Sequence, residues 1–167
     1  MNYSIKVTGL QEATGMLREA IHAGIVNGLH KTGERGVALV SANAPVASGV
    51  LANAITAEYS GVQGMMKATV FSQPPADVYA PPVETGTRPH FPPPSMLLPW
   101  VKQRFSPASE KEALSIAFAI AKTIAKRGTK GKFMFDRSHK QLQTEATGIF
   151  EREIATQLQT AGFGGRQ

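Results

Sequence analysis

The chain has 167 residues, a formal net charge of +6 and no cysteine. This length suffices for one domain with a modest core, and the lack of cysteine excludes disulfide scaffolds, cysteine-ligated zinc sites and thiol nucleophiles. Charged residues are only 18% of the chain, which also holds 16 Gly and 11 Pro, so we expect long loops and surfaces that partners cover.

Residues 1–10 and the longest apolar run of the chain carry no signal for secretion or membrane insertion. Residues 1–10 lack the basic start and apolar run of a secretory signal. The longest apolar run, residues 116–121, ends at Lys122 and is too short to span a bilayer. We therefore expect an intracellular site of synthesis and a soluble product.

The positive charge is concentrated in one segment. Residues 1–100 balance six basic against six acidic side chains, whereas residues 122–140 hold seven basic side chains against Asp136 alone. Such a cluster is typical of a surface that faces a polyanion or an acidic partner, although a solvated helix end and loop give the same pattern. The seven are Lys122, Lys126, Arg127, Lys130, Lys132, Arg137 and Lys140.

The N-terminal third predicts a short strand followed by a long helix. Residues 4–7 alternate as in a strand, and Thr8 with Gln11 forms a capping box that marks a helix start. The helix should run to about Asn43, because Pro45 restricts the residue before it. Its expected apolar face consists of Ile21, Ile25, Leu29, Gly33, Gly36, Val37 and Val40.

Five glycines fall within this helix, and each costs up to ~1 kcal/mol relative to alanine. They indicate either a break near Gly15 or the close approach of another backbone along Gly24 and Gly28. In a membrane the latter pair would be a dimerisation motif; here tight packing within the chain is favoured.

A β-hairpin is expected next. Residues 54–60 and 66–72 alternate apolar and polar side chains, and the glycine-containing segment 61–64 separates them. One face of the first strand should present Ile55, Ala57 and Tyr59, and one face of the second Met66, Ala68 and Val70.

Residues 74–99 contain nine of the eleven prolines. Proline removes a backbone donor, so we expect neither helix nor central strand here, but an extended arm ordered by contacts; a disordered loop is the alternative. Its large apolar side chains, and Trp100 directly after it, are costly to leave in water. We assign to a subunit interface Tyr79, Val83, Glu84, Phe91, Met96, Leu97 and Trp100.

Two further helices are expected. Ser109 and Glu112 form a capping box for a helix that ends near Gly128. Its apolar residues form two stripes: Leu114, Phe118, Ala121 and Ala125 on one side, and Ile116, Ile120 and Ile124 on the other. A helix that is apolar on two sides is buried centrally or shared between two bodies, so we assign the isoleucine row to a subunit interface.

The last helix should run from about Arg137 to Thr160, capped by Asp136 and stopped at Gly162. Its single apolar stripe is Leu142, Ala146, Phe150, Ile154 and Leu158. Together these elements predict one α+β domain over residues 1–163, with the arm at 74–99 and a loose end at 164–167.

Catalytic and cofactor signals are weak throughout the chain. The four histidines have no metal-ligand spacing, and no nucleophile elbow is present. The glycine- and lysine-rich segment 128–132 lacks the spacing of a phosphate loop. Glu84 has no evident catalytic partner and makes ordinary sense as an ion-pair or backbone-capping group. We therefore predict no catalytic residues, no metal, no cofactor and no enzymatic activity.

Three segments, taken in order, carry a resemblance: residues 44–51 (APVASGVL), residues 79–87 (YAPPVETGT), and residues 127–135, where Arg127-Gly128-Thr129 precedes Phe133 and Phe135. The chain resembles the tail-component family of the neck gene cluster of tailed phages, the gene-product-ten-like group, over residues 4 to 155. It departs from the family pattern at Ala47, Ser48 and Pro81-Pro82, which replace the usual acid, threonine and aromatic.

This resemblance implies an α+β fold with a long helix against an antiparallel sheet, and a non-enzymatic place at the head–tail junction. It implies copies of the chain assembled as a ring around the DNA channel, beside head-closure, tail-terminator or tail-tube rings, without membrane contact. The expected location is the neck or proximal tail of the virion, after synthesis in the bacterial cytoplasm. Two alternatives remain: a nucleic-acid-binding module that uses residues 122–140, and a transient tail-assembly chaperone.

Overall fold

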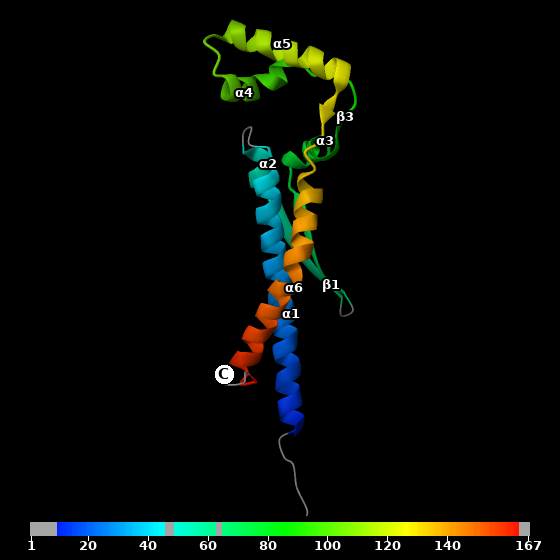
Figure 1. The fold of residues 1–167 in the computed structure, drawn as a ribbon, viewed down its shortest axis with the longest axis vertical. Helices are drawn as coiled ribbons and strands as arrows, with labels where there is room; N and C mark the ends of the chain where they lie inside the picture. Colours follow the sequence, from blue (N-terminus) through cyan, green and yellow to red (C-terminus); the bar gives the residue numbers. More distant parts are fainter. Residues whose placement is uncertain (1–9, 46–48, 63–64, 164–167) are drawn as a thin grey trace, which may run out of the picture.

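The computed structural model describes residues 10–45, 49–62 and 65–163. The fold is α+β, as the sequence predicts: a long N-terminal helix, two small antiparallel sheets and further helices toward the C-terminus. The molecule is elongated, and two long helices follow its length while a helical hairpin lies across one end (Figure 1). The strand expected at residues 4–7, the Thr8 cap and the loose end at 164–167 lie outside the described residues.

The first helix, α1 (Leu10–Asn43), is continuous and has no break at Gly15. It ends at Asn43, as the following Pro45 predicts. The Asn43 amide Nδ2 donates to the Leu39 carbonyl and to the Ser138 hydroxyl, both at 3.0 Å, which ties this end of α1 to the last helix.

The last helix, α6 (Met134–Thr160), packs along α1 on a strip of glycines. A methyl group on Gly24 would lie 2.5 Å from the Ile154 Cα, and one on Gly28 would lie 2.5 Å from the Phe150 ring. Close backbone approach is therefore the reason for these glycines. The expected apolar face of α1 is wrong at Ile21 and Ile25, which are each 37% exposed, because α6 crosses on the glycine side of the helix.

Two strands, β1 (Ile55–Val62) and β2 (Met65–Ser72), form the predicted hairpin beside α1. The strands reach farther than expected, because Gly61 and Val62 pair with Met66 and Met65 instead of forming a loop. The Tyr59 ring packs 4.0 Å from that of His30, and its hydroxyl donates to the His30 carbonyl at 3.1 Å.

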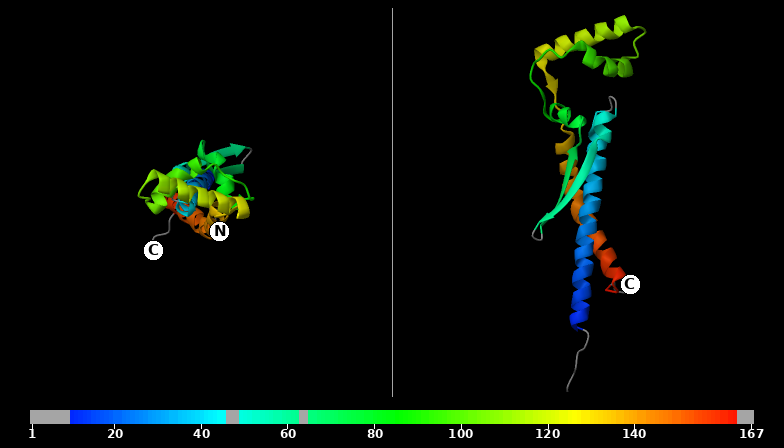
Figure 2. Two further views of the ribbon diagram at one scale, coloured as in Figure 1. Left: turned by 90° about the horizontal axis from the view of Figure 1, so that it is seen from above. Right: turned by 180° about the vertical axis from the view of Figure 1, so that it is seen from behind.

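Two further glycines of α1, Gly33 and Gly36, allow the hairpin to pack closely on this helix. A methyl group on Gly33 would meet the Tyr59 hydroxyl at 2.5 Å, and one on Gly36 would meet Val70 at 3.0 Å. The main core lies where the C-terminal end of α1, the hairpin and the start of α6 meet (Figure 2). Its buried members are Val40, Ala44, Ile55, Ala80 and Met134, with Leu51, from helix α2 (Val50–Asn53), Val83 and Phe135 packed against them.

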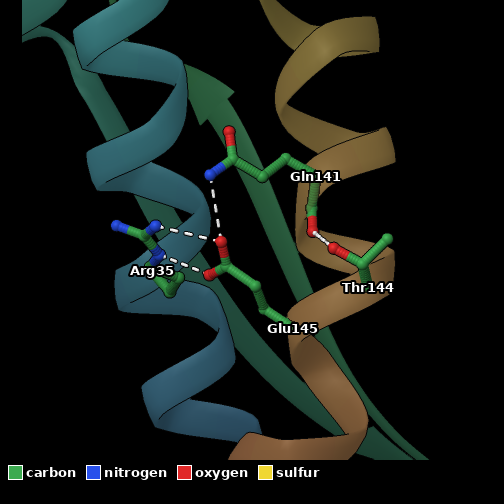
Figure 3. Close-up of polar contacts among 4 residues, drawn as sticks. All are labelled: Arg35, Gln141, Thr144 and Glu145. Atoms are coloured by element: carbon green, nitrogen blue, oxygen red, sulfur yellow. Dashed lines mark hydrogen bonds and ion pairs between the residues drawn. The ribbon is translucent and has the colours of Figure 1, made fainter.

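A salt bridge between Arg35 and Glu145 joins α1 to α6 beside this core (Figure 3). Arg35 donates to both carboxylate oxygens of Glu145, at 2.6 and 3.1 Å, and Gln141 Nε2 donates to Glu145 at 3.0 Å. The hydrogen bond from Arg35, followed by the one from Gln141, lowers the pKa of Glu145 to about 2.

The depressed pKa of Glu145 makes a pH-dependent contribution to stability. A carboxyl with a lowered folded-state pKa stabilises the fold above the unfolded-state pKa of about 4.3, and this contribution is lost as the pH falls toward 2. Urea unfolding of the parent and of Glu145→Gln should therefore differ most at pH 6 and converge near pH 2. The exposed Glu58→Gln is the control; an equal difference at both pH values would contradict this role.

The proline-rich segment corrects the prediction of an arm without helix. It contains the 3-10 turn η1 (Ala76–Val78), helix α3 (Ala80–Thr85), strand β3 (Gly86–Thr87) and the start of helix α4 (Pro94–Phe105). Prolines are tolerated in the first turn of a helix, whose N–H groups have no intrahelical partner, and both α3 and α4 carry proline there. Within the segment 74–99, only residues 74–75, 79 and 88–93 lack helix or strand.

Helices α4 and α5 (Glu110–Arg127) form an antiparallel hairpin with its own small core. We call this hairpin, together with the segment that follows it to Lys132, the head (residues 94–132), and the remainder the body. The capping box is confirmed, since the Ser109 hydroxyl accepts the Glu112 N–H at 3.2 Å, and Gly128 is the C-cap of α5 as expected. Buried in the head core are Val101, Ala113 and Ala117, with Leu97, Leu98, Ile116 and Ile120 packed around them.

Candidate assembly interface

A two-residue ladder joins the head to the body. Strand β3 pairs antiparallel with β4 (Thr129–Lys130), which directly follows α5. The Thr87 N–H donates to the Thr129 hydroxyl at 3.0 Å, the Thr129 N–H donates to the Thr87 hydroxyl at 3.2 Å, and the two hydroxyls lie 2.9 Å apart. The sequence patterns Gly86-Thr87 and Gly128-Thr129, 42 residues apart, thus meet in space.

Glycine is required on both sides of this ladder. Gly86 has φ 82° and Gly128 has φ 67°, a region that side chains disfavour. A methyl group on Gly86 would collide with the Thr129 carbonyl, and one on Gly128 with the Thr87 carbonyl. The Lys132 N–H donates to the Val83 carbonyl at 2.8 Å, so the backbone of the glycine- and lysine-rich segment helps to join the head to the body.

Glu84 caps α6 from outside that helix. Its carboxylate accepts the Phe135 and Asp136 N–H groups at 2.9 and 3.1 Å, and its carbonyl accepts the Phe133 N–H at 3.0 Å. An acidic group at a helix N-terminus satisfies free donors and complements the helix dipole. The backbone-capping interpretation of Glu84 is therefore confirmed.

The predicted start of the last helix at Arg137 is wrong, because Glu84 and not Asp136 caps this helix. The helix begins at Met134, three residues before Arg137, and Asp136 lies in its first turn instead of capping it. Asp136 instead pairs with Lys140 at 2.7 Å. A capping carboxylate that comes from 50 residues away leaves no local sequence signal.

An apolar groove of about 530 Å³ lies between the head and the body. Tyr79, Met96 and Trp100 line it and are 50%, 65% and 38% exposed. None of its lining residues carries a charge, so a charged group of a partner would lose its water there without gaining an opposite charge. The complete lining is Pro45, Val50, Leu51, Pro75, Tyr79, Val83, Ser95, Met96, Pro99 and Trp100.

Of the ten predicted interface residues, four line the groove, three pack in the head core, and Glu84 caps α6; Phe91 and Ile124 do none of these. Tyr79, Val83, Met96 and Trp100 come together in the groove, and Phe91 is exposed on the connection between body and head. Leu97, Ile116 and Ile120 instead pack in the head core, and Ile124 is half-buried.

The assignment of the two stripes on α5 is corrected. The isoleucine row belongs to the face that packs on α4, whereas Leu114 and Phe118 are 41% and 44% exposed. Both stripes were visible in the sequence. The buried one could have been recognised by Ala113 and Ala117, small residues at four-residue spacing that allow close packing of α4. Ala121, expected on the Leu114 side, is also buried.

The predicted basic residues are all exposed but do not lie on one element. Lys122, Lys126 and Arg127 occupy the last turns of α5, Lys130 lies on β4, and Lys132 follows it. Arg137 and Lys140 lie on α6 in the body, where Lys140 is paired.

Within residues 10–45, 49–62 and 65–163, no three histidine or acidic side chains are arranged to hold a metal ion. None of the helices in this part of the chain has the length and hydropathy needed to cross a membrane. The chain matches no protein-family model, no curated protein and no solved structure.

Proposed function

We propose that this chain is a structural, non-enzymatic subunit of a tailed-phage particle, a neck or tail-completion component whose copies assemble into a ring at the head–tail junction around the DNA channel. The observation that carries the proposal is the uncharged groove between head and body, where Tyr79, Met96 and Trp100 are left exposed. Contiguous apolar surface of this kind marks a protein–protein contact, and aromatic residues and methionine are enriched at such contacts.

The partner in the groove is a second copy of the chain. The head carries a separate apolar surface, Leu114 and Phe118, on the face of α5 that α4 does not cover. A chain with two different apolar surfaces makes a heterologous contact with its neighbour, and such contacts close into rings when the rotation between copies allows.

The resemblance to the neck family also gains support from the way its segments pack. Leu51, Val83 and Phe135 come from the three separate segments and pack against the same core. Glu84 of the second segment caps the helix that begins in the third. An ordered set of motifs that builds one structural unit supports the resemblance better than any motif alone. The remaining partners are the adjoining neck and tail rings, and the location is the virion.

Removing the apolar side chains of the groove should block assembly. The variant Tyr79→Ser/Met96→Ser/Trp100→Ala should be incorporated into phage particles at least tenfold less than the parent, because central aromatic contacts commonly contribute 2 kcal/mol or more each. Incorporation is measured by quantitative mass spectrometry of purified particles, and correct folding by thermal unfolding monitored by circular dichroism.

The matched control is Met65→Ser/Val78→Ser, which removes exposed apolar side chains outside the groove (81% and 72% exposed). This control should be incorporated like the parent. Normal incorporation of the groove variant would contradict the proposed contact. Absence of the parent from finished particles whose assembly nevertheless requires it would identify a transient chaperone instead.

A further inference from the structure

The head carries the entire net charge of the chain. Residues 94–132 hold eight basic side chains against two acidic ones, whereas the other residues of the chain hold ten of each. The excess of +6 is thus located on one small structural unit, which the sequence segment 122–140 only partly overlaps. Arg104, at the end of α4, and Lys111, at the start of α5, belong to this unit.

Seven of the eight cations are exposed and unpaired within the part of the chain that the structure describes. Lys102 pairs with Glu110, and Glu112 accepts the Ala108 N–H at 2.7 Å. Both acidic side chains of the head are therefore already engaged. The seven that remain are Arg104, Lys111, Lys122, Lys126, Arg127, Lys130 and Lys132.

These charges are spread too widely for a small anion. The helix α5 alone has 18 residues, about 27 Å at 1.5 Å per residue, and it carries cations near both ends. A duplex nucleic acid presents one negative charge per ~1.7 Å of its axis and can match charges over such a length. Lys111, Lys122 and Lys126 lie within about 60° of one another around α5, at 100° per residue, so one duplex can contact all three along the length of the helix.

We propose that the head binds the phosphate backbone of duplex DNA without sequence preference. The proposal names the partner of the head within the proposed ring, but it rests on charge and exposure and applies equally to a single copy. It also changes the expected set of seven basic residues. Arg137 and Lys140 belong to the body and are excluded, while Arg104 and Lys111 are added.

The test is a titration of the full chain with two unrelated fluorescent 30-base-pair duplexes between 50 and 200 mM NaCl. Phosphate contacts give a slope of log K against log salt of about −0.9 per contact. Seven contacts set the upper limit, a slope of about −6, and four contacts give about −4, which is a loss of affinity of roughly a hundredfold or more over this range. The two duplexes should bind equally.

The decisive variant is Lys122→Gln/Lys126→Gln/Lys130→Gln/Lys132→Gln, which should reduce the steepness of the slope by about 3 to 4. The matched control, Lys31→Gln/Lys67→Gln/Arg137→Gln/Lys140→Gln, removes the same charge from the body and should leave the slope unchanged. An equal effect of both variants would overturn the assignment to the head.

Absence of DNA binding at 50 mM NaCl would overturn the proposal, and binding to phosphatidylserine vesicles without DNA binding would identify a membrane surface instead. Light scattering on the same samples reports self-association. A failure of DNA binding is thereby distinguished from a failure of the chain to assemble.

Discussion

Replacement of Gly24 by alanine should destabilise the chain by about 2 kcal/mol or more, although alanine is the better helix former. The added methyl would lie 2.5 Å from the Cα of Ile154, a backbone atom that cannot rotate aside. The helices α1 and α6 must therefore separate. Overpacking against a backbone atom lies at or above the upper end of the usual ~1–3 kcal/mol, and the gain in helix propensity offsets only up to ~1 kcal/mol of this cost. Thermal unfolding should show a drop in Tm of roughly 4–8 °C.

The same helix supplies the control. Gly15 has nothing within 4 Å of the position of an added methyl, so Gly15→Ala should raise stability by up to ~1 kcal/mol through helix propensity alone. Equal stabilisation by both substitutions would mean that α6 does not approach α1 at Gly24.

Gly128→Ala should loosen the head from the body. Alanine at φ 67° is strained by about 1–3 kcal/mol, and its methyl would collide with the Thr87 carbonyl across the ladder. Because head and body have separate cores, each should stay folded while the ladder opens. Limited proteolysis should therefore cleave residues 88–93 and 128–132 roughly tenfold faster or more than in the parent, since cleavage follows the population of the open form.

Gly148→Ala is the control for Gly128→Ala, because the added methyl group would meet only the flexible end of the Arg152 side chain, at 3.4 Å. It should leave the cleavage rate unchanged. If Gly128→Ala were cleaved no faster than the parent, the ladder would not be what holds the head in place.

Elements with local signals were predictable from the sequence. The end of α1 follows from Pro45, the hairpin from alternation, and the start of α5 from the Ser109–Glu112 capping box. Each of these signals acts within a few residues, through a restricted dihedral, a pleat or a cap. The glycines at 24 and 28 also indicated close packing, but not which segment would approach.

The wrong predictions concern places where segments distant in the sequence meet, or where a local signal has two meanings. The helix α6 begins early because Glu84 supplies its cap from another element. The helices α3 and α4 form despite their prolines, which occupy first turns, and Pro99 is accommodated inside α4. The isoleucine row was assigned to the wrong partner, because a helix with two apolar stripes does not indicate which of them its neighbour in the chain will cover.

The sequence predicts which side chains belong to the candidate site, but not that they line a groove. Tyr79, Val83, Met96 and Trp100 were recognised individually as apolar side chains in a proline-rich segment. The groove that collects them lies between α4 and two segments distant from it in the sequence, residues 45–51 and 75–83. Likewise, the basic segment was visible, but its boundary follows the head and not the sequence run.

The central claim is that the groove between head and body is a contact between copies of this chain in a phage neck. A cryo-electron microscopy reconstruction of the neck of intact particles tests it directly. The expected result is a closed ring of copies in which Tyr79, Met96 and Trp100 of each copy are covered by the next, with the heads turned toward the DNA channel. Particles that lack the chain, or copies whose grooves open to solvent, would contradict it.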